Sequence, residues 1–338
     1  MPGDGESKEG PKATTTNVAK RVESSSETDD REHNLADFMK YRVFRFLHYY
    51  AGRGDPLGTA IRAEAAKRGM DVRVTPCEKE DGVDLLKAEP FKEHCDLAGQ
   101  GHWDGFHAGF PCTSFSRLRW RKAEGYPGPC RSKRHPYGLP TNTPRLQREC
   151  DDGTVHASRS VMLGKLILGA REGKGLTPAV TLENPPPSDL EEHLSAWELP
   201  EVKKFVEGHE LGAAYFATCK YQRDLAVGMR YLKPQAFKGS LLGLAGLSGS
   251  CPCGSGARHL AVVGKERSAS SASYPVALCQ AYAKLLLDHF ERVGTLEYYQ
   301  RRAVVLEKEL QTMPTAPWSR PTRRSSTRRP RRRSRWRR

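Results

Sequence analysis

The cysteine in GFPCTSFSRLR (109–119) stands in a setting that suits covalent chemistry. Cys112 follows a proline, which restricts the preceding residue and orients a turn, and Arg117, Arg119 and Arg121 come shortly after it. Only the thiolate is a strong nucleophile, and backbone N–H groups and nearby cations lower the pKa of a thiol. Intracellular cysteines are most often small buried apolar groups, but the surrounding Ser, Thr and Arg argue against an apolar environment. We therefore expect Cys112 to be a nucleophile.

A second candidate for chemistry is the glutamate of TLENPPPS (181–188). Glu183 comes at the exit of a predicted buried strand, and burial raises the pKa of a carboxyl group so that it can donate or share a proton at neutral pH. The three prolines that follow would stiffen its loop. The alternative is a loop carboxylate that accepts hydrogen bonds from local backbone.

Three glycines separate a predicted strand from a predicted helix in AGRGDPLG (51–58). They are Gly52, Gly54 and Gly58. Such glycines allow the backbone to approach a ligand at a helix N-terminus, although a tight turn without a ligand also uses them. Glu78 follows the next strand, where α/β nucleotide sites place a ribose-binding acid, and Asp84 could hold an adenine amine. An adenosine-type ligand is predicted, and both a dinucleotide and S-adenosylmethionine remain open.

The composition indicates a folded protein in a reducing compartment. The chain has 338 residues, 37% of them hydrophobic, and no apolar run approaches the ~18 residues of a membrane span. Its nine cysteines are scattered and odd in number, which does not suit a disulfide framework. The net charge is +15, and eleven arginines lie in residues 319–338. We expect no membrane contact.

We expect one folded domain between two disordered tails. Residues 1–38 and the Arg-rich 313–338 carry too few large apolar side chains to bury a core. Residues 41–290 form the domain, with a basic insert at 117–152, and 291–312 form a helical extension. The Arg-rich tail suits nucleic-acid contact or nuclear import, and the alternative is a solubilising tail. We predict a nuclear location.

Strands that alternate with helices predict an α/β fold with a mostly parallel sheet. The predicted strands cover 41–50, 71–77, 103–110, 178–183, 213–221 and 229–234, and the predicted helices 59–69, 157–172, 202–210 and 273–290. Ligands bind such sheets at the carboxyl ends of the strands. The glycine turn, Cys112 and Glu183 all follow predicted strands, so they should converge.

Together these segments resemble the cytosine-5 DNA methyltransferases over about residues 43–287. FLHYYAGRGDPLG is similar to the cofactor loop of that family, and WDGFHAGFPCTSFS to its nucleophile motif. PAVTLENPPPS is similar to its Glu-Asn motif, and SASYPVALCQAYAKLL to its last motif, a helix that completes the cofactor pocket. The resemblance implies that 41–290 is a catalytic domain with a Rossmann-like, S-adenosylmethionine-dependent methyltransferase fold. It also implies that the protein binds DNA and that it is a monomer.

The resemblance further implies a role for each motif. Cys112 would add to C6 of a flipped cytosine while Glu183 stabilises the protonated N3, so that C5 takes the methyl group of S-adenosylmethionine. The family holds the base with a Q-x-R-x-R motif after Glu-Asn; only CKYQRDLAVGMRYLKP stands there, so Arg230 is our choice, with Arg223 second. The residues expected to bind the cofactor are Tyr50, Ala51, Gly52, Gly54, Gly58, Glu78 and Asp84.

The chain departs from the family in several places. Phe-Pro-Cys-Thr replaces Pro-Pro-Cys-Gln, and Glu-Asn-Pro replaces Glu-Asn-Val. The insert at 117–152 holds nine Lys and Arg interleaved with Trp120, Tyr126 and Tyr137, a mixture that suits phosphate contact and base stacking, or else a solvated loop. Its expected nucleic-acid-binding residues are Arg117, Arg119, Trp120 and Arg121. Only about 40 residues separate Arg230 from the last motif, so the family's target-recognition region is short or missing.

Other functions stay open. The altered motifs suit a catalytically decayed module that only binds nucleic acid, and RNA could replace DNA as the substrate. NPP at 184–186 is similar to the Asn-Pro-Pro-aromatic loop of amino-methylating enzymes, but no aromatic residue follows it. Cys251, Cys253 and His259, with Cys219, could bind zinc; their spacing departs from C-x₂₋₄-C, so we predict no metal.

Overall fold

The computed structural model describes residues 34–121, 127–260, 262 and 273–312. The predicted Arg-rich tail, most of the predicted N-terminal tail and Tyr126 of the basic insert lie outside these ranges. Within them, no helix combines the length and the apolar character needed to cross a membrane.

A six-stranded mixed sheet forms the centre of the fold. Its strands are β1 (Val43–Tyr49), β2 (Asp71–Cys77), β3 (Gly105–Ala108), β4 (Ala179–Asn184), β5 (Gly212–Ala217) and β6 (Pro234–Gly239). The order is β2-β1-β3-β4-β6-β5, and only β6 runs antiparallel to its neighbours. The predicted α/β class with a mostly parallel sheet is therefore confirmed.

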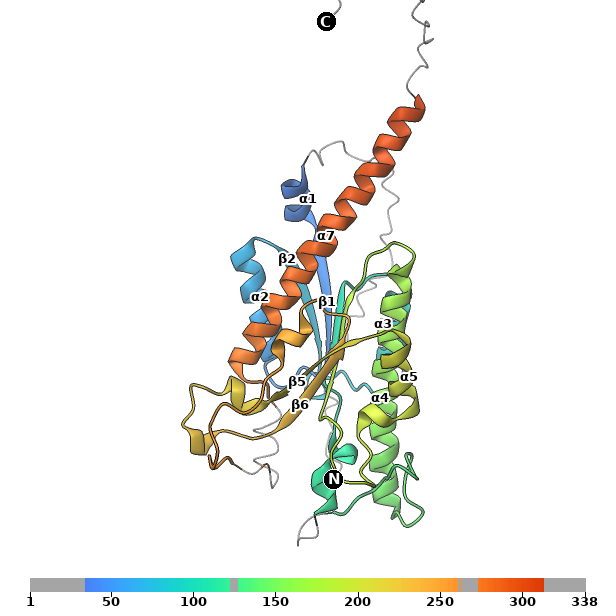
Figure 1. The fold of residues 1–338 in the computed structure, drawn as a ribbon. Coiled ribbons are helices and arrows are strands. Elements are labelled where there is room, and N and C mark those ends of the chain that lie inside the picture. The colour runs from blue at the N-terminus through green and yellow to red at the C-terminus, as the bar shows by residue number, and fades with distance from the viewer. Residues whose placement is uncertain (1–33, 122–126, 261, 263–272, 313–338) are drawn as a thin grey trace, which may run out of the picture.

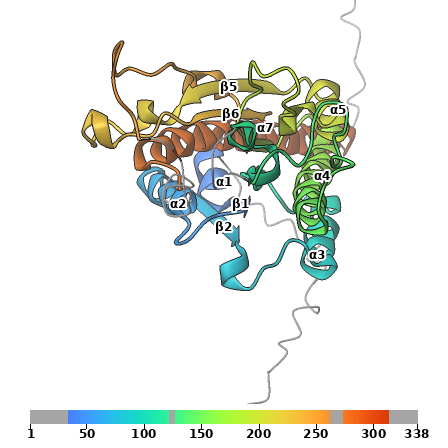
Figure 2. The same cartoon turned by 90° about the horizontal axis from the view of Figure 1, so that it is seen from below.

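Helices cover both faces of the sheet (Figures 1 and 2). On one face lie α2 (Pro56–Arg68) and α7 (Val276–Thr312), and on the other α3 (Ala88–Gly99), α4 (Pro144–Glu172) and α5 (Pro200–Gly208). Each face has its own hydrophobic core, one built around Phe46 and Tyr282 and the other around Phe106 and Phe205. The sheet is buried on both sides, which is what a parallel sheet requires.

The helix after the glycine turn forms where the sequence predicts it. Pro56 occupies the first turn of α2, the Asp55 side chain accepts a hydrogen bond from Gly58 N, and Gly69 ends the helix with φ +66°. These are the usual start and stop signals of a helix. The turn is therefore anchored at its far end by a rigid element.

Several predicted boundaries differ from the structure. The strand predicted at 229–234 is wrong: a 3₁₀ helix covers Val227–Met229, and β6 starts only at Pro234 because Pro234 pairs with the end of β5. Helix α4 starts at Pro144, capped by Thr143, so the last part of the predicted insert is helical. Helix α7 runs unbroken through residue 291, where we predicted the start of a separate extension, and Glu297 in that extension pairs with Arg42 at 3.0 Å.

Two helices were missed in the sequence. Helix α1 (Leu35–Tyr41) lies partly in the predicted tail, where Asn34 caps it and Phe38 packs 5.7 Å from the ring of Tyr298. Helix α3 packs Phe91, Cys95 and Ala98 against the core at helical spacing, so its apolar periodicity was present in the sequence and was overlooked.

The order of the strands places a topological switch point between β1 and β3. From β1 the chain continues to β2 on one side, and it then returns to β3 on the other side of β1. Tyr49, the last residue of β1, lies opposite Ala108, the last residue of β3. Open α/β sheets bind ligands at such a switch point, outside the carboxyl ends of the strands. The glycine turn and the Cys112 loop border it.

Candidate functional site

The loop that carries Cys112 starts at the end of β3 and is fixed from within. Cys112 is partly exposed and immediately precedes a 3₁₀ helix, Thr113–Phe115. The fully buried Arg131 donates hydrogen bonds to Ser114 Oγ at 3.0 Å and to the Cys150 carbonyl at 2.6 Å. Its guanidinium also lies 4.1 Å from the centre of the Phe115 ring. Arg131 therefore holds the turn that presents Cys112, a role that we missed because its sequence neighbours are ordinary loop residues.

The carboxyl group of Glu183 lies at the end of β4 and is almost fully buried. Tyr274 donates a hydrogen bond to Oε2 at 3.3 Å, whereas Oε1 is buried without a partner among the described residues. Burial raises the pKa of Glu183, as predicted, and the charge of Lys233 opposes part of that rise. An unpartnered buried oxygen with a raised pKa is an acid that can face a substrate.

Contacts between the two loops bring Cys112 and Glu183 together. Asn184 Nδ2 donates to the Phe110 carbonyl at 3.0 Å, which ties the end of β4 to the Cys112 loop. A Cβ at Gly109 would lie 2.6 Å from the Tyr274 hydroxyl and 3.1 Å from Glu183 Oε2, so only glycine fits there. The charge of Glu183 in turn raises the pKa of Cys112. The predicted pair thus shares one site.

The electrostatics around Cys112 differ from the prediction. Burial raises the pKa of the Cys112 thiol, and the cation that lowers it is Lys233 rather than an arginine of the following segment. Arg119 is buried and bonds to the Thr113 carbonyl at 2.8 Å and to Glu149. The expectation that the arginine cluster lowers the pKa of Cys112 is therefore wrong, and the resting sulfur is a thiol.

Arg230 does not lie beside the pair. Its guanidinium donates to the carbonyl oxygens of Leu225 at 2.7 Å and Arg223 at 3.2 Å, and to the sulfur of Cys253 at 3.4 Å. Lys233, just before β6, is the basic residue whose charge reaches both Cys112 and Glu183. The structure places Lys233 where we expected Arg230, because β6 starts later than predicted.

A buried polar chain supports Glu183. The Tyr274 hydroxyl lies 3.0 Å from His107 Nε2, and His107 Nδ1 lies 2.8 Å from Thr181 Oγ1. Burial lowers the pKa of His107, which favours the neutral ring. When Tyr274 donates to Glu183, neutral His107 donates from Nε2 to Tyr274 and accepts from Thr181 at Nδ1. The orientation of Tyr274 is therefore determined by two strands, β3 and β4.

The glycine turn has open space beside two of its glycines. Gly52 and Gly54 have φ values of +70° and +78°, and no atom lies within 4 Å of a Cβ built on either one. Gly52 N donates to Glu78 Oε2 at 2.8 Å, which joins the ends of β1 and β2. Burial raises the pKa of Glu78. The turn and the predicted ribose-binding acid thus form one surface.

The remaining predicted cofactor residues differ in their surroundings. Tyr50 has φ +58° and its hydroxyl lies 3.0 Å from His156 Nδ1, while Ala51 is buried beside it. A Cβ at Gly58 would overlap the Asp55 carboxylate, at 1.8 Å, so Gly58 serves the helix cap. Asp84 accepts a hydrogen bond from Leu86 N at 3.0 Å and is partly exposed.

The predicted nucleic-acid-binding residues divide into two groups. Arg117 and Arg121 are exposed, and Trp120 is half-buried between them, so these three can contact a ligand. Arg119 is wrong as a nucleic-acid contact, because its guanidinium is used inside the protein.

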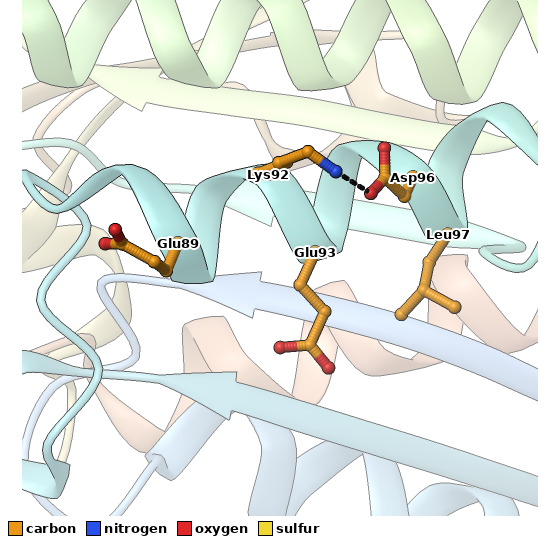
Figure 3. Close-up of a pocket in the computed structure, with 5 residues that line it drawn as sticks. All are labelled: Glu89, Lys92, Glu93, Asp96 and Leu97. Carbon is orange, nitrogen blue, oxygen red and sulfur yellow. Dashed lines mark hydrogen bonds and ion pairs between the residues drawn. The ribbon is translucent and has the colours of Figure 1, made fainter. Parts of the chain in front are cut away.

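A hollow on α3 is separate from this site. Figure 3 shows that one helix supplies its lining, with Lys92 and Asp96 paired at 2.6 Å. It is lined by Glu89, Lys92, Glu93, Asp96 and Leu97. Its described lining contains no cysteine, histidine or aromatic side chain, and we assign it no function.

Comparison with known proteins finds no family model and no curated protein that matches this chain.

Proposed function

We propose that this protein methylates C5 of cytosine in DNA with S-adenosylmethionine as methyl donor, on a Rossmann-like methyltransferase fold. One observation carries the proposal: Cys112 and Glu183 share a site at the ends of neighbouring strands β3 and β4, beside the switch point of the sheet. A thiol and an acid on opposite edges of one flat ring are what addition to a cytosine requires. The unpartnered Glu183 Oε1 supports a ligand at this place.

The chain's own residues divide the proposed reaction between them. The Cys112 thiol first gives its proton to solvent; its sulfur then forms a bond to C6, the C5–C6 π electrons move toward N3, and Glu183 gives N3 its proton. Lys233 stabilises the negative charge, which lies first on sulfur and then on the Glu183 carboxylate. Once C5 carries the methyl group, a base removes the C5 proton, the thiolate leaves C6, and N3 returns its proton to the Glu183 carboxylate, so the C5–C6 double bond and the neutral ring are restored.

The glycine turn fits the proposed methyl donor. The open side of Gly52 and Gly54 gives backbone room for it, and Glu78 lies at the ribose-binding position, already joined to the turn. Tyr50 and Ala51 would border it. S-adenosylmethionine supplies an electrophilic methyl group when it is bound.

A mechanism-based adduct tests the proposal. In DNA that contains 5-fluorocytosine, fluorine cannot leave as a proton, so the bond between Cys112 and C6 should persist after methyl transfer. We expect the wild-type chain with S-adenosylmethionine to give a denaturation-resistant band that Cys112→Ser abolishes. Glu183→Gln should slow its formation by roughly 10²–10⁴-fold, the usual effect of losing a general acid. Cys95→Ser, on α3, is the matched control and should leave the band unchanged.

A nucleic-acid-binding module without activity is the second candidate function. The raised pKa of Cys112 favours it, because a thiol is a weak nucleophile. Tight binding of DNA without an adduct on any cytosine-bearing DNA or RNA would refute the enzyme and leave this candidate. An adduct on RNA alone would change the substrate and keep the chemistry.

A further inference from the structure

Three cysteines and a histidine meet close to the segment that follows β5. They are Cys219, Cys251, Cys253 and His259. Their potential ligand atoms all lie within 4.8 Å of one another, and Cys251 Sγ lies 3.4 Å from His259 Nε2. The segments between them hold the 3₁₀ helix Val227–Met229 and strand β6. The cluster therefore joins positions that are distant along the chain.

The separations suit a tetrahedral metal ion. Zinc binds thiolate sulfur at about 2.3 Å and imidazole nitrogen at about 2.0 Å, so that neighbouring ligands lie about 3–4 Å apart. Four protein ligands leave no open position, as in structural zinc sites. Thiolate and imidazole ligands together favour zinc over calcium or magnesium, which prefer oxygen.

The surroundings of the cluster also suit a zinc–thiolate centre. Three thiolates and a neutral imidazole around one zinc ion carry a net charge of −1, and the Arg230 guanidinium lies 3.4 Å from Cys253 Sγ. Cys253 N points to Cys251 Sγ at 3.5 Å, a backbone donor to a ligand sulfur. Such outer contacts orient metal ligands and balance their charge. Arg230 would therefore balance the negative charge of the thiolates.

Most of the chain around the cluster is irregular. Two isolated bridges, Phe216 with Gly249 and Tyr231 with Leu260, and single backbone hydrogen bonds such as Thr218 N to the Lys233 carbonyl at 2.9 Å connect its segments. A metal that joins Cys219 to the 251–259 loop would fix the segment leading to Lys233. Structural zinc sites supply folding free energy in such loops.

We propose that Cys219, Cys251, Cys253 and His259 bind one structural zinc ion, which fixes the segment between β5 and α7. This site requires no methyl transfer, so its test is independent of the proposed function.

Metal content of the full chain tests the proposal. Protein purified without chelators from zinc-supplemented medium should hold about one zinc per chain, measured by mass spectrometry of the metal. The double variant Cys251→Ser/Cys253→Ser should lose it, whereas Cys95→Ser, half-buried on α3, should keep it. His259→Cys should also keep it, because a fourth thiolate restores the ligand set.

A cobalt spectrum covers the case in which the double variant does not fold. Cobalt added to the metal-free wild-type chain should give the intense visible bands of tetrahedral thiolate coordination, and zinc should remove them. Wild-type protein with less than about a tenth of a zinc per chain and no such bands would overturn the proposal. Equal zinc loss in Cys95→Ser would overturn it as well.

Discussion

Replacing Glu183 by glutamine should change how the stability of the protein depends on pH. Burial raises the pKa of Glu183 in the folded protein, and the unfolded chain has an ordinary carboxyl pKa near 4.3. Between these two pKa values the folded state binds more protons than the unfolded state. The free energy of unfolding therefore falls as the pH rises through this window, by up to about 1.4 kcal/mol per pH unit. Glutamine does not titrate, so the free energy of unfolding of Glu183→Gln does not fall in this way as the pH rises.

The assay is urea unfolding of both proteins at a series of pH values from 4 upward. All other titrating groups are common to both proteins, so the difference between their unfolding free energies isolates Glu183. We expect this difference to move in favour of the variant as the pH rises, and to become constant above the pKa of folded Glu183.

Glu297→Gln is the matched control with the opposite sign. Although burial opposes it, the charge of Arg42 lowers the pKa of Glu297. Glu297 therefore stabilises the fold above its unfolded pKa, and this stabilisation is lost as the pH falls through its lowered pKa. Parallel pH curves for wild type and Glu183→Gln, alongside a normal response of Glu297→Gln, would show that Glu183 has an ordinary pKa. The proposed acid would then be refuted.

Three further predictions concern the residues that support the site. Gly109→Ala should destabilise the protein by about 1–3 kcal/mol in urea unfolding, because its Cβ would displace a buried hydroxyl, whereas Gly169→Ala, with open space around it on α4, should be neutral or stabilising. Arg131→Met should cost about 3–5 kcal/mol, because it deprives the Ser114 hydroxyl and the Cys150 carbonyl of a charged donor, at about 1.5–3 kcal/mol for each such hydrogen bond, and the exposed Arg134→Met should cost less than about 1 kcal/mol. Glu78→Ala should weaken S-adenosylmethionine binding in calorimetry much more than it changes the melting temperature of the free protein.

Specific outcomes would contradict each of these. Equal stability of the two glycine variants would mean that the Cys112 loop can shift away from Tyr274. A small effect of Arg131→Met would mean that Ser114 and the Cys150 carbonyl find water instead. Unchanged cofactor affinity in Glu78→Ala would remove Glu78 from the proposed site.

The sequence predicts this fold wherever a local signal and the tertiary packing agree. The first strand, the glycine turn and α2 could be predicted because the apolar run, the cap at Asp55 and Gly69 are all local. The strand at 229–234 could not, because the isolated bridges and the Cys253 contact of Arg230 are set by distant residues. Helix α3 was missed although its signal is local, since Phe91, Cys95 and Ala98 recur at helical spacing and pack against the core.

The same division holds for the site. Cys112 follows β3 and Glu183 lies at the end of the neighbouring strand β4, so the topology brings them together. Arg131 and Lys233 were missed because each acts on residues that are distant in the sequence. Arg131 donates a hydrogen bond to Ser114, and the charge of Lys233 lowers the pKa values of Cys112 and Glu183. Arg119 was misassigned for the converse reason, since nothing local shows that Glu149 holds it inside.

In the proposed reaction, the charge of Lys233 can stabilise the anionic forms of both Cys112 and Glu183. Burial raises the pKa of both Cys112 and Glu183, so both resting groups favour their neutral forms. The addition step needs charge first on the sulfur, while proton transfer to N3 leaves charge on the carboxylate. The charge of Lys233 favours the ionised form of each group, and the two need its help one after the other. The charge of one lysine can therefore serve both groups, because the bond to C6 removes the charge from sulfur as Glu183 acquires it.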